Sequence, residues 1–187
     1  PNSFTLTKGT AMTTVTPSAT GGAITGWSVS PSLPAGLSLD ASTGAISGTP
    51  TAVTSSATYT VTASNTGGST TADVTIVVND IAPASLSYSP NSFTLTKGTA
   101  MTTVTPTSSG GAITTWSVSP SLPSGLSLDS STGAISGTPS VVSTSTSYTI
   151  TGSNTGGSTT ATVSITVNDI APSSLCLLYT SDAADDP

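Results

Sequence analysis

The sequence predicts an all-β protein built from tandem antiparallel β-sandwiches, and three observations lead to this prediction. Val, Ile and Thr alternate with other residues in the manner of strands that bury one face. The stretch Pro1–Pro17 returns letter for letter as Pro90–Pro106. No segment keeps a period of about 3.6 residues over three turns, so we expect a helix content near zero.

The repeat sets the domain organisation. The two copies are offset by 89 residues throughout, because Trp27 returns as Trp116 and nothing is inserted or deleted between the copies. This period is too long for solenoid repeats of roughly 20 to 50 residues and is close to the roughly 100 residues of a sandwich domain. Each copy is therefore expected to be an independent domain.

We place the domain boundaries in the linkers that follow each copy. The predicted units are 1–81 for repeat 1, which is truncated at its N-terminus, 82–170 for repeat 2, 171–175 for the start of a third repeat, and 176–187 for a non-native tail. Each linker runs into Ile-Ala-Pro, and proline stiffens the backbone, so we expect short and semi-rigid linkers.

Alternation marks the strands within one copy. Residues 58–63 and 74–78 alternate on either side of the turn residues 65–68, which predicts a long antiparallel hairpin at the end of the domain. Further short strands precede it, and together they are expected to supply one modest core. The expected core residues of repeat 1 are Phe4, Trp27, Val29, Leu37, Leu39, Ile46, Tyr59, Val61, Val74 and Ile76, with counterparts from Phe93 to Ile165 in repeat 2.

The charge inventory argues against catalysis and against several kinds of partner. Charged residues are 5% of the chain, the net charge is −6, the only cations are Lys8 and Lys97, and histidine is absent. Nucleic acid and anionic membranes need clustered Lys or Arg, and the commonest general base is missing. No apolar run approaches the roughly 18 residues that span a bilayer. We therefore predict that the chain is not an enzyme, that it has no catalytic or cofactor-binding residue, and that this fragment does not insert into a membrane. Both lysines are expected to be exposed edge charges.

The central part of each copy resembles a known family. The stretches Leu33–Asp40 (LPAGLSLD) and Ser42–Pro50 (STGAISGTP) are similar to the pattern LPxGLxLDxxTGxIxGTP of the putative Ig family of bacterial surface proteins, which is related to cadherin-like and dystroglycan-type modules. The match recurs at Leu122–Pro139. The resemblance implies an immunoglobulin-like (cadherin-like) sandwich in a large extracellular adhesin or stalk. From the residues themselves we expect the Asp40 side chain to cap the turn that ends at Gly44.

Calcium is a candidate ligand because cadherin-like modules hold it between domains. The candidate ligands are the linker pairs Asn79 and Asp80, and Asn168 and Asp169. Calcium takes roughly six to eight oxygen ligands, and one Asp per linker without any Glu leaves such a site short of charge. The alternative is that Asp80 caps the linker turn, so we expect no cofactor and keep calcium as the open alternative.

Residues 176–187 resemble a translated sequencing adapter. The repeat should continue with Ser-Tyr-Ser-Pro-Asn, as in Ser87–Asn91, and instead reads Cys-Leu-Leu-Tyr-Thr-Ser-Asp-Ala-Ala-Asp-Asp-Pro. A genuine acidic tail is the alternative.

These observations favour a structural and adhesive repeat module of a secreted or surface-displayed bacterial protein. Its expected partners are neighbouring repeats and an unidentified protein or glycan on a cell surface. Three alternatives stay open: a calcium-binding adhesion module, a carbohydrate-binding accessory module of a secreted enzyme, and a phage surface module. The carbohydrate-binding alternative requires exposed aromatic residues, whereas the core is expected to use most of Phe4, Trp27 and Tyr59.

Overall fold

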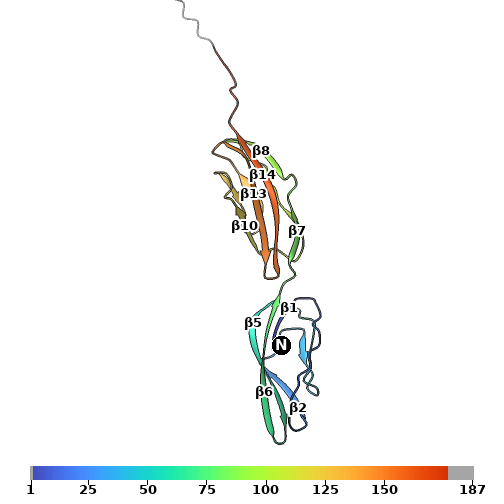
Figure 1. Cartoon of the computed structure of the whole chain (residues 1–187). Helices are drawn as coiled ribbons and strands as arrows, with labels where there is room; N and C mark the ends of the chain where they lie inside the picture. Colours follow the sequence, from blue (N-terminus) through green and yellow to red (C-terminus); the bar gives the residue numbers. More distant parts are fainter. Residues whose placement is uncertain (1, 177–187) are drawn as a thin grey trace, which may run out of the picture.

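The computed structural model describes residues 2–176, which form two all-β units joined end to end (Figure 1). Repeat 1 holds β1 to β6 and repeat 2 holds β7 to β14. No helix occurs among these residues, and therefore none that is long and apolar enough to cross a membrane. The predicted all-β fold class is confirmed.

Repeat 1 is a sandwich of a four-stranded sheet and a short hairpin. The sheet has the strand order β1-β6-β5-β2, and β3 pairs with β4 in the facing layer. A bridge between Val15 and Ile46 extends this layer by one contact. The strands are β1 (Ser3–Thr7), β2 (Gly26–Ser30), β3 (Leu37–Leu39), β4 (Ile46–Gly48), β5 (Thr54–Asn65) and β6 (Gly68–Asn79).

Repeat 2 reproduces this arrangement and adds one strand pair. Its main sheet has the order β10-β13-β14-β8, and the facing layer holds the pairs β11-β12 and β7-β9. The strands are β7 (Pro83–Ser87), β8 (Ser92–Thr96), β9 (Thr107–Gly110), β10 (Thr115–Ser119), β11 (Leu126–Leu128), β12 (Ile135–Gly137), β13 (Ser143–Asn154) and β14 (Gly157–Asn168).

One edge of each main sheet is parallel, which the sequence did not predict. β1 runs parallel to β6, with Phe4 opposite Ile76, and β8 runs parallel to β14, with Phe93 opposite Ile165. Between these strands the chain crosses to the facing layer and returns, so the first and last strands of the sheet run in the same direction. The other strand pairs of the described residues are antiparallel, as expected.

The long terminal hairpin is confirmed in both repeats. β5 and β6 pair over their whole length around the turn Asn65–Gly68, where Gly68 has a φ of 144° and the Asn65 Oδ1 atom accepts the Gly67 N–H at 2.8 Å. Glycine and asparagine suit such turns because they tolerate positive φ or hydrogen-bond their own backbone.

The core is more complete in repeat 2 than in repeat 1. Repeat 2 buries Ile135, Ile150, Val163 and Ile165 fully and adds Leu86 and Tyr88 from the β7 segment. In repeat 1 the buried members of the predicted core are Ile46, Tyr59, Val61 and Ile76. The other predicted members are only half-buried, namely Phe4, Trp27, Val29, Leu37, Leu39 and Val74.

Candidate functional site

The four predicted calcium ligands lie in two separate places. Asn79 and Asn168 end β6 and β14, so the two Asn-Asp pairs stand at opposite ends of repeat 2 (Figure 1). Within residues 2–176 no three His, Cys, Asp or Glu side chains come together as a metal-binding group. The structure thus brings one carboxylate to each linker, and calcium binding stays an open alternative.

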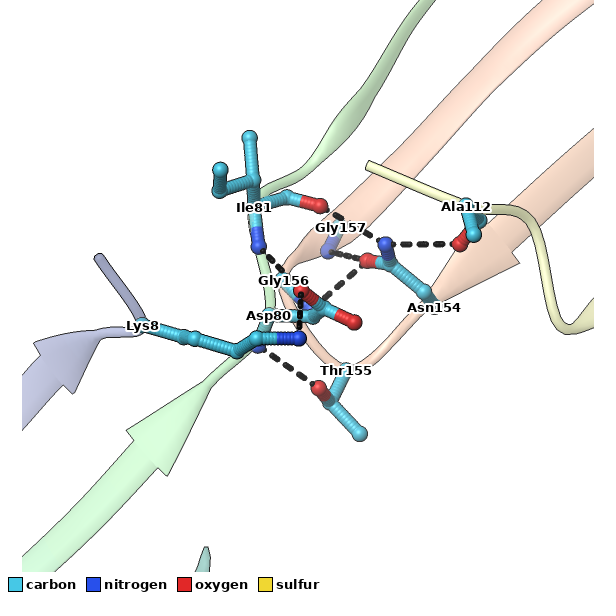
Figure 2. Close-up of polar contacts among 8 residues, drawn as sticks. All are labelled: Lys8, Asp80, Ile81, Ala112, Asn154, Thr155, Gly156 and Gly157. Carbon is cyan, nitrogen blue, oxygen red and sulfur yellow. Dashed lines mark hydrogen bonds and ion pairs between the residues drawn. The ribbon is translucent and has the colours of Figure 1, made fainter. Parts of the chain in front are cut away.

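Asp80 connects the linker to both repeats. Its backbone N–H donates to the Thr155 Oγ1 atom at 2.9 Å, and its carboxylate accepts the Ile81 N–H at 3.0 Å (Figure 2). The Lys8 Nζ atom lies 3.6 Å from the same carboxylate. Lys8 was expected to be an exposed edge charge, and its side chain is indeed 43% exposed beside the edge strand β1, within reach of the linker. A solvent-exposed ion pair contributes only about 0 to 1 kcal/mol, so this contact adds little to the stability of the junction.

Asn154, at the tip of the β13–β14 hairpin, ties three segments together. Its Nδ2 atom donates to the carbonyl oxygens of Ile81 (2.7 Å) and Ala112 (3.0 Å), and its Oδ1 atom accepts the N–H of Gly156 at 2.8 Å and of Gly157 at 3.2 Å (Figure 2). One amide side chain therefore fixes the hairpin tip, the linker and the loop before β10 relative to one another.

Glycines let the linker backbone lie directly against repeat 2. A Cβ atom on Gly156 would stand 2.0 Å from the Asp80 carbonyl oxygen, and one on Gly111 would stand 1.8 Å from the Ile81 carbonyl oxygen. The Gly111 N–H also donates to the Ala82 carbonyl oxygen at 3.1 Å. At both positions any side chain would push the linker away.

Within residues 2–176, no linker segment lies against the equivalent hairpin tip of repeat 1. A Cβ atom on Gly67, the counterpart of Gly156, would meet only the Asn65 side chain at 3.2 Å. This tip lies at the end of repeat 1 that points away from repeat 2 (Figure 1). The glycine requirement at the tip therefore comes from the passing linker and not from the hairpin itself.

Sequence reasoning missed the linker contacts of Asn154, Thr155 and Gly156. It identified these residues only as a hairpin turn. The hydrogen bonds that join Thr155 to Asp80 and Asn154 to Ile81 span 75 and 73 positions of the chain. The one available signal was that the turn and the linker recur together in both copies, which does not reveal that they touch.

Asp40 and Asp129 have the same structural role in the two repeats. The Asp40 Oδ1 atom accepts the N–H groups of Ser42 (2.8 Å) and Thr43 (2.9 Å), which confirms the predicted cap. These bonds, first that of Thr43 and then that of Ser42, lower the pKa of Asp40. Asp129 accepts the N–H groups of Ser131 and Thr132, and its pKa is lowered for the same reason.

Tyr88 is the one titratable core residue that distinguishes repeat 2 from repeat 1. It is 5% exposed, and its hydroxyl donates to the Gly133 carbonyl oxygen at 2.6 Å. Burial raises the pKa of Tyr88 to about 12. The hydroxyl therefore stays protonated at ordinary pH and holds the β7 segment against the turn before β12.

Comparison with known proteins places both repeats in one family. A family model described as "Putative Ig domain" matches residues 1–79 and again 82–168. The serine-rich adhesin for platelets of Staphylococcus aureus is 37% identical over 139 residues, which cover 70% of this chain and 6% of that protein. The protein of the same description from strain MRSA252 is 36% identical over 139 residues, which cover 70% of this chain and 10% of it. The chain thus spans a tenth or less of the length of these relatives.

Solved structures show the same architecture. The N-terminal four Ig domains of Dscam1 isoform 9.44 align with a TM-score of 0.52 and 14% identity, covering 89% of this chain and 43% of that one. Isoform 8.4 aligns with a TM-score of 0.50, 14% identity and the same coverage. At this identity the likeness shows the fold alone, which is a series of immunoglobulin-like domains.

Proposed function

The chain belongs to the Putative Ig domain family, and we propose that its two repeats are non-catalytic structural and adhesive beads of a large secreted or cell-surface bacterial protein. The curated relatives are named as adhesins, which supports an adhesive setting. In this setting the repeats act as spacers that set the distance and direction between more distant parts of the protein.

The geometry of the junction carries the spacer role. The linker is held by hydrogen bonds with Thr155, Asn154 and Gly111 of repeat 2 and faces Lys8 of repeat 1. A linker held in this way restricts the angle between beads, whereas a free linker would let the array coil. The longest strands have 12 residues and rise about 3.3 Å per residue, so each bead adds about 40 Å to the array.

Array length tests the spacer role. Tandem arrays of increasing repeat number should show a maximum dimension in small-angle X-ray scattering that grows linearly with the number of repeats. Beads joined by flexible linkers would instead give a maximum dimension that grows much more slowly than the number of repeats. That result would contradict the proposal.

The adhesive role concerns an unidentified protein or glycan on a host or cell surface. Platelets flowed over a surface coated with the 187-residue chain test direct contact, with the heat-unfolded chain as the matched control. Retention above the control supports contact through the beads. Retention equal to the control leaves the beads as spacers that carry an adhesive region elsewhere in the longer protein.

We propose that the junction works without calcium. The Asp80 carboxylate already accepts the Ile81 N–H and faces Lys8, so a cation would have to displace the ammonium group. The melting temperatures of both repeats should be the same with millimolar calcium and with excess chelator. A clear rise with calcium that Asp80→Asn abolishes would restore the alternative of a site at Asn79 and Asp80, and one that Asp169→Asn abolishes would restore a site at Asn168 and Asp169.

A further inference from the structure

Each repeat carries its one cationic residue in the turn that follows the edge strand at the parallel side of its main sheet. Lys8 follows β1 and Lys97 follows β8, and the 187 residues contain no other lysine and no arginine. Both lysine turns read Thr-Lys-Gly-Thr, at residues 7–10 and 96–99. A protease that cuts after a cationic residue therefore finds one candidate bond in each bead, the bond that follows the lysine.

Hydrogen bonds hold the backbone on both sides of this bond. In repeat 2 the Lys97 N–H donates to the Asn168 carbonyl oxygen at 2.9 Å, and the Gly98 N–H donates to the Pro139 carbonyl oxygen at 2.8 Å. Gly98 has a φ of 78°, which lies in the left-handed region and not in the extended one. Repeat 1 has both hydrogen bonds at the equivalent positions, each 2.8 Å long.

The residues that flank the lysine turn of repeat 2 are anchored in the bead as well. Leu95 and Met101 pack against the core, and the Met101 N–H donates to the Gly137 carbonyl oxygen at 2.9 Å. Phe93 is 8% exposed and lies opposite Ile165 of β14. A segment long enough to fill the cleft of a protease therefore cannot leave the bead without uncovering part of the core.

These contacts close the bond to proteases while the bead is folded. Serine proteases bind the chain on either side of the bond they cut as an extended strand, and cutting concentrates at exposed loop tips whose backbone is free. In the lysine turn the N–H groups on both sides of the bond are engaged and the glycine is not extended. Cutting there requires β8 to separate from β14, which is an opening of the bead and not a fluctuation of one turn.

We propose that the bond after Lys97, like the bond after Lys8, is a latent cleavage site for extracellular trypsin-like serine proteases, closed in the folded bead and opened when the edge strand leaves the main sheet. The cationic side chain suits the acidic pocket with which such proteases select their substrates. Hydrolysis adds one water molecule across the amide bond and leaves the carboxylate of Lys97 and the amino group of Gly98.

The cut makes the opening of a bead irreversible. It separates β7 and β8 from the rest of repeat 2, and with them the buried side chains of Leu86, Tyr88 and Phe93. Because the beads are joined in series, one cut also divides the array at the opened bead. Folded beads of the same array are spared, so the sites remove only beads that have lost their structure.

Limited digestion with trypsin at increasing urea concentration tests the proposal. Mass spectrometry should show a fragment that begins at Gly98, and its rate of appearance should follow the unfolded fraction of repeat 2, read from Trp116 fluorescence in a Trp27→Phe background. Ser174→Lys is the matched control, because Ser174 is exposed and lies in no strand. This introduced site should be cut in the folded chain and reports the activity of trypsin at each urea concentration. Without urea the cut after Lys97 should be at least about 1,000-fold slower than the cut at the introduced site.

Two core substitutions separate opening of one bead from opening of the other. At low trypsin concentration Phe93→Ala should raise the rate of the cut after Lys97 by about 100-fold or more, because cutting follows the population of the opened bead. Phe4→Ala should leave this rate unchanged and raise the rate of the cut after Lys8. The proposal is overturned by a cut after Lys97 in the folded chain that is as fast as at the introduced site, or by a rate that neither urea nor Phe93→Ala changes. An unfolded chain that trypsin leaves intact at Lys97 would overturn it as well.

Discussion

The two repeats have nearly the same sequence and yet differ in structure at one place. In repeat 2 the residues Thr107–Gly110 form β9 against β7, whereas residues 18–21 of repeat 1 lie in no strand. The inward residues of β14 are covered and those of β6 are open at the same end. The strand forms in the repeat where β7 lies beside it, and the two segments also differ in sequence, since residues 18–21 read Ser-Ala-Thr-Gly and residues 107–110 read Thr-Ser-Ser-Gly.

The largest expected difference between the repeats concerns the first phenylalanine. Phe93 is 8% exposed and Phe4 is half-buried. We expect Phe93→Ala to lower the free energy of unfolding of repeat 2 by about 3 to 5 kcal/mol. Phe4→Ala should lower that of repeat 1 by only about 1 to 2 kcal/mol, since less apolar area is lost. Equal losses in the two repeats would mean that the exposed inward residues of β6 do not weaken the core of repeat 1.

Each repeat can be followed separately in this experiment. The chain has two tryptophans, Trp27 in repeat 1 and Trp116 in repeat 2. Urea unfolding monitored by fluorescence therefore reports repeat 2 in a Trp27→Phe background and repeat 1 in a Trp116→Phe background.

The next effect concerns the hairpin tips. Gly156→Ala places a Cβ atom against the Asp80 carbonyl oxygen, whereas Gly67→Ala meets only the Asn65 side chain. We expect Gly156→Ala to destabilise repeat 2 by about 1 to 3 kcal/mol, because the linker has to shift. Gly67→Ala should change repeat 1 by much less. Distances between spin labels on the two repeats should broaden for Gly156→Ala alone, and an unchanged distribution would show that the tip does not fix the junction.

A smaller effect is expected from the Tyr88 hydroxyl. Tyr88→Phe removes the hydrogen bond to the Gly133 carbonyl oxygen, so repeat 2 should lose about 1 kcal/mol and repeat 1 should lose nothing. Urea unfolding in the two single-tryptophan backgrounds measures both values. A loss in repeat 1 would contradict the assignment of Tyr88 to the core of repeat 2.

The same hydroxyl gives repeat 2 a specific sensitivity to alkali. The pKa of Tyr88 is raised from 10.0 to about 12 in the folded state, so folding favours the protonated form. This stabilisation is fully present below pH 10 and is lost as the pH rises through about 12. The melting temperature of repeat 2 should therefore fall over this range, and the fall should be shallower in Tyr88→Phe.

The smallest difference is expected in acid, where the repeats should behave alike. The pKa values of Asp40 and Asp129 are both lowered from 3.8 by backbone N–H groups. Stability from these carboxylates is present above pH 3.8 and is lost as the pH falls through the lowered pKa of the folded state. Each of Asp40→Asn and Asp129→Asn should make the melting temperature of its own repeat depend less on pH in the acid range. The size of this effect should be the same in the two repeats. Unequal effects would show that the structural difference between the repeats extends to this turn.

The sequence predicted the elements whose signal is local. Alternation identified the long hairpin, and Asp40 followed by Gly44 identified the capped turn, because in both cases the interacting residues are close in the chain. The fold class and the relation to surface adhesins followed from the repeat and from the motif that ends at Pro50, and both are borne out.

The sequence did not predict the features that depend on distant contacts. Pro83 was expected to end the linker and no strand was predicted directly after it, whereas Pro83 begins β7, whose strand character comes from pairing with β9 and from burial of Leu86 and the following Tyr88. The clamp of Asn154 and Gly156 on the linker was missed because no pattern in the chain links the two segments. The division of the chain at residue 81 stays a prediction, and of the proposed adapter residues 176–187 only Cys176 is among those described; it is a free and exposed cysteine.

The parallel edge of each main sheet has a mechanical consequence. In repeat 2 the chain enters the sheet through β8 and leaves it through β14, and these neighbouring strands point the same way. A pull on the two ends of the chain therefore drags β8 and β14 past each other along their length, so that their hydrogen bonds are loaded together in shear and not peeled apart one after another. A bead of this kind resists force best along the direction in which flow or a moving cell would stretch a tethered protein.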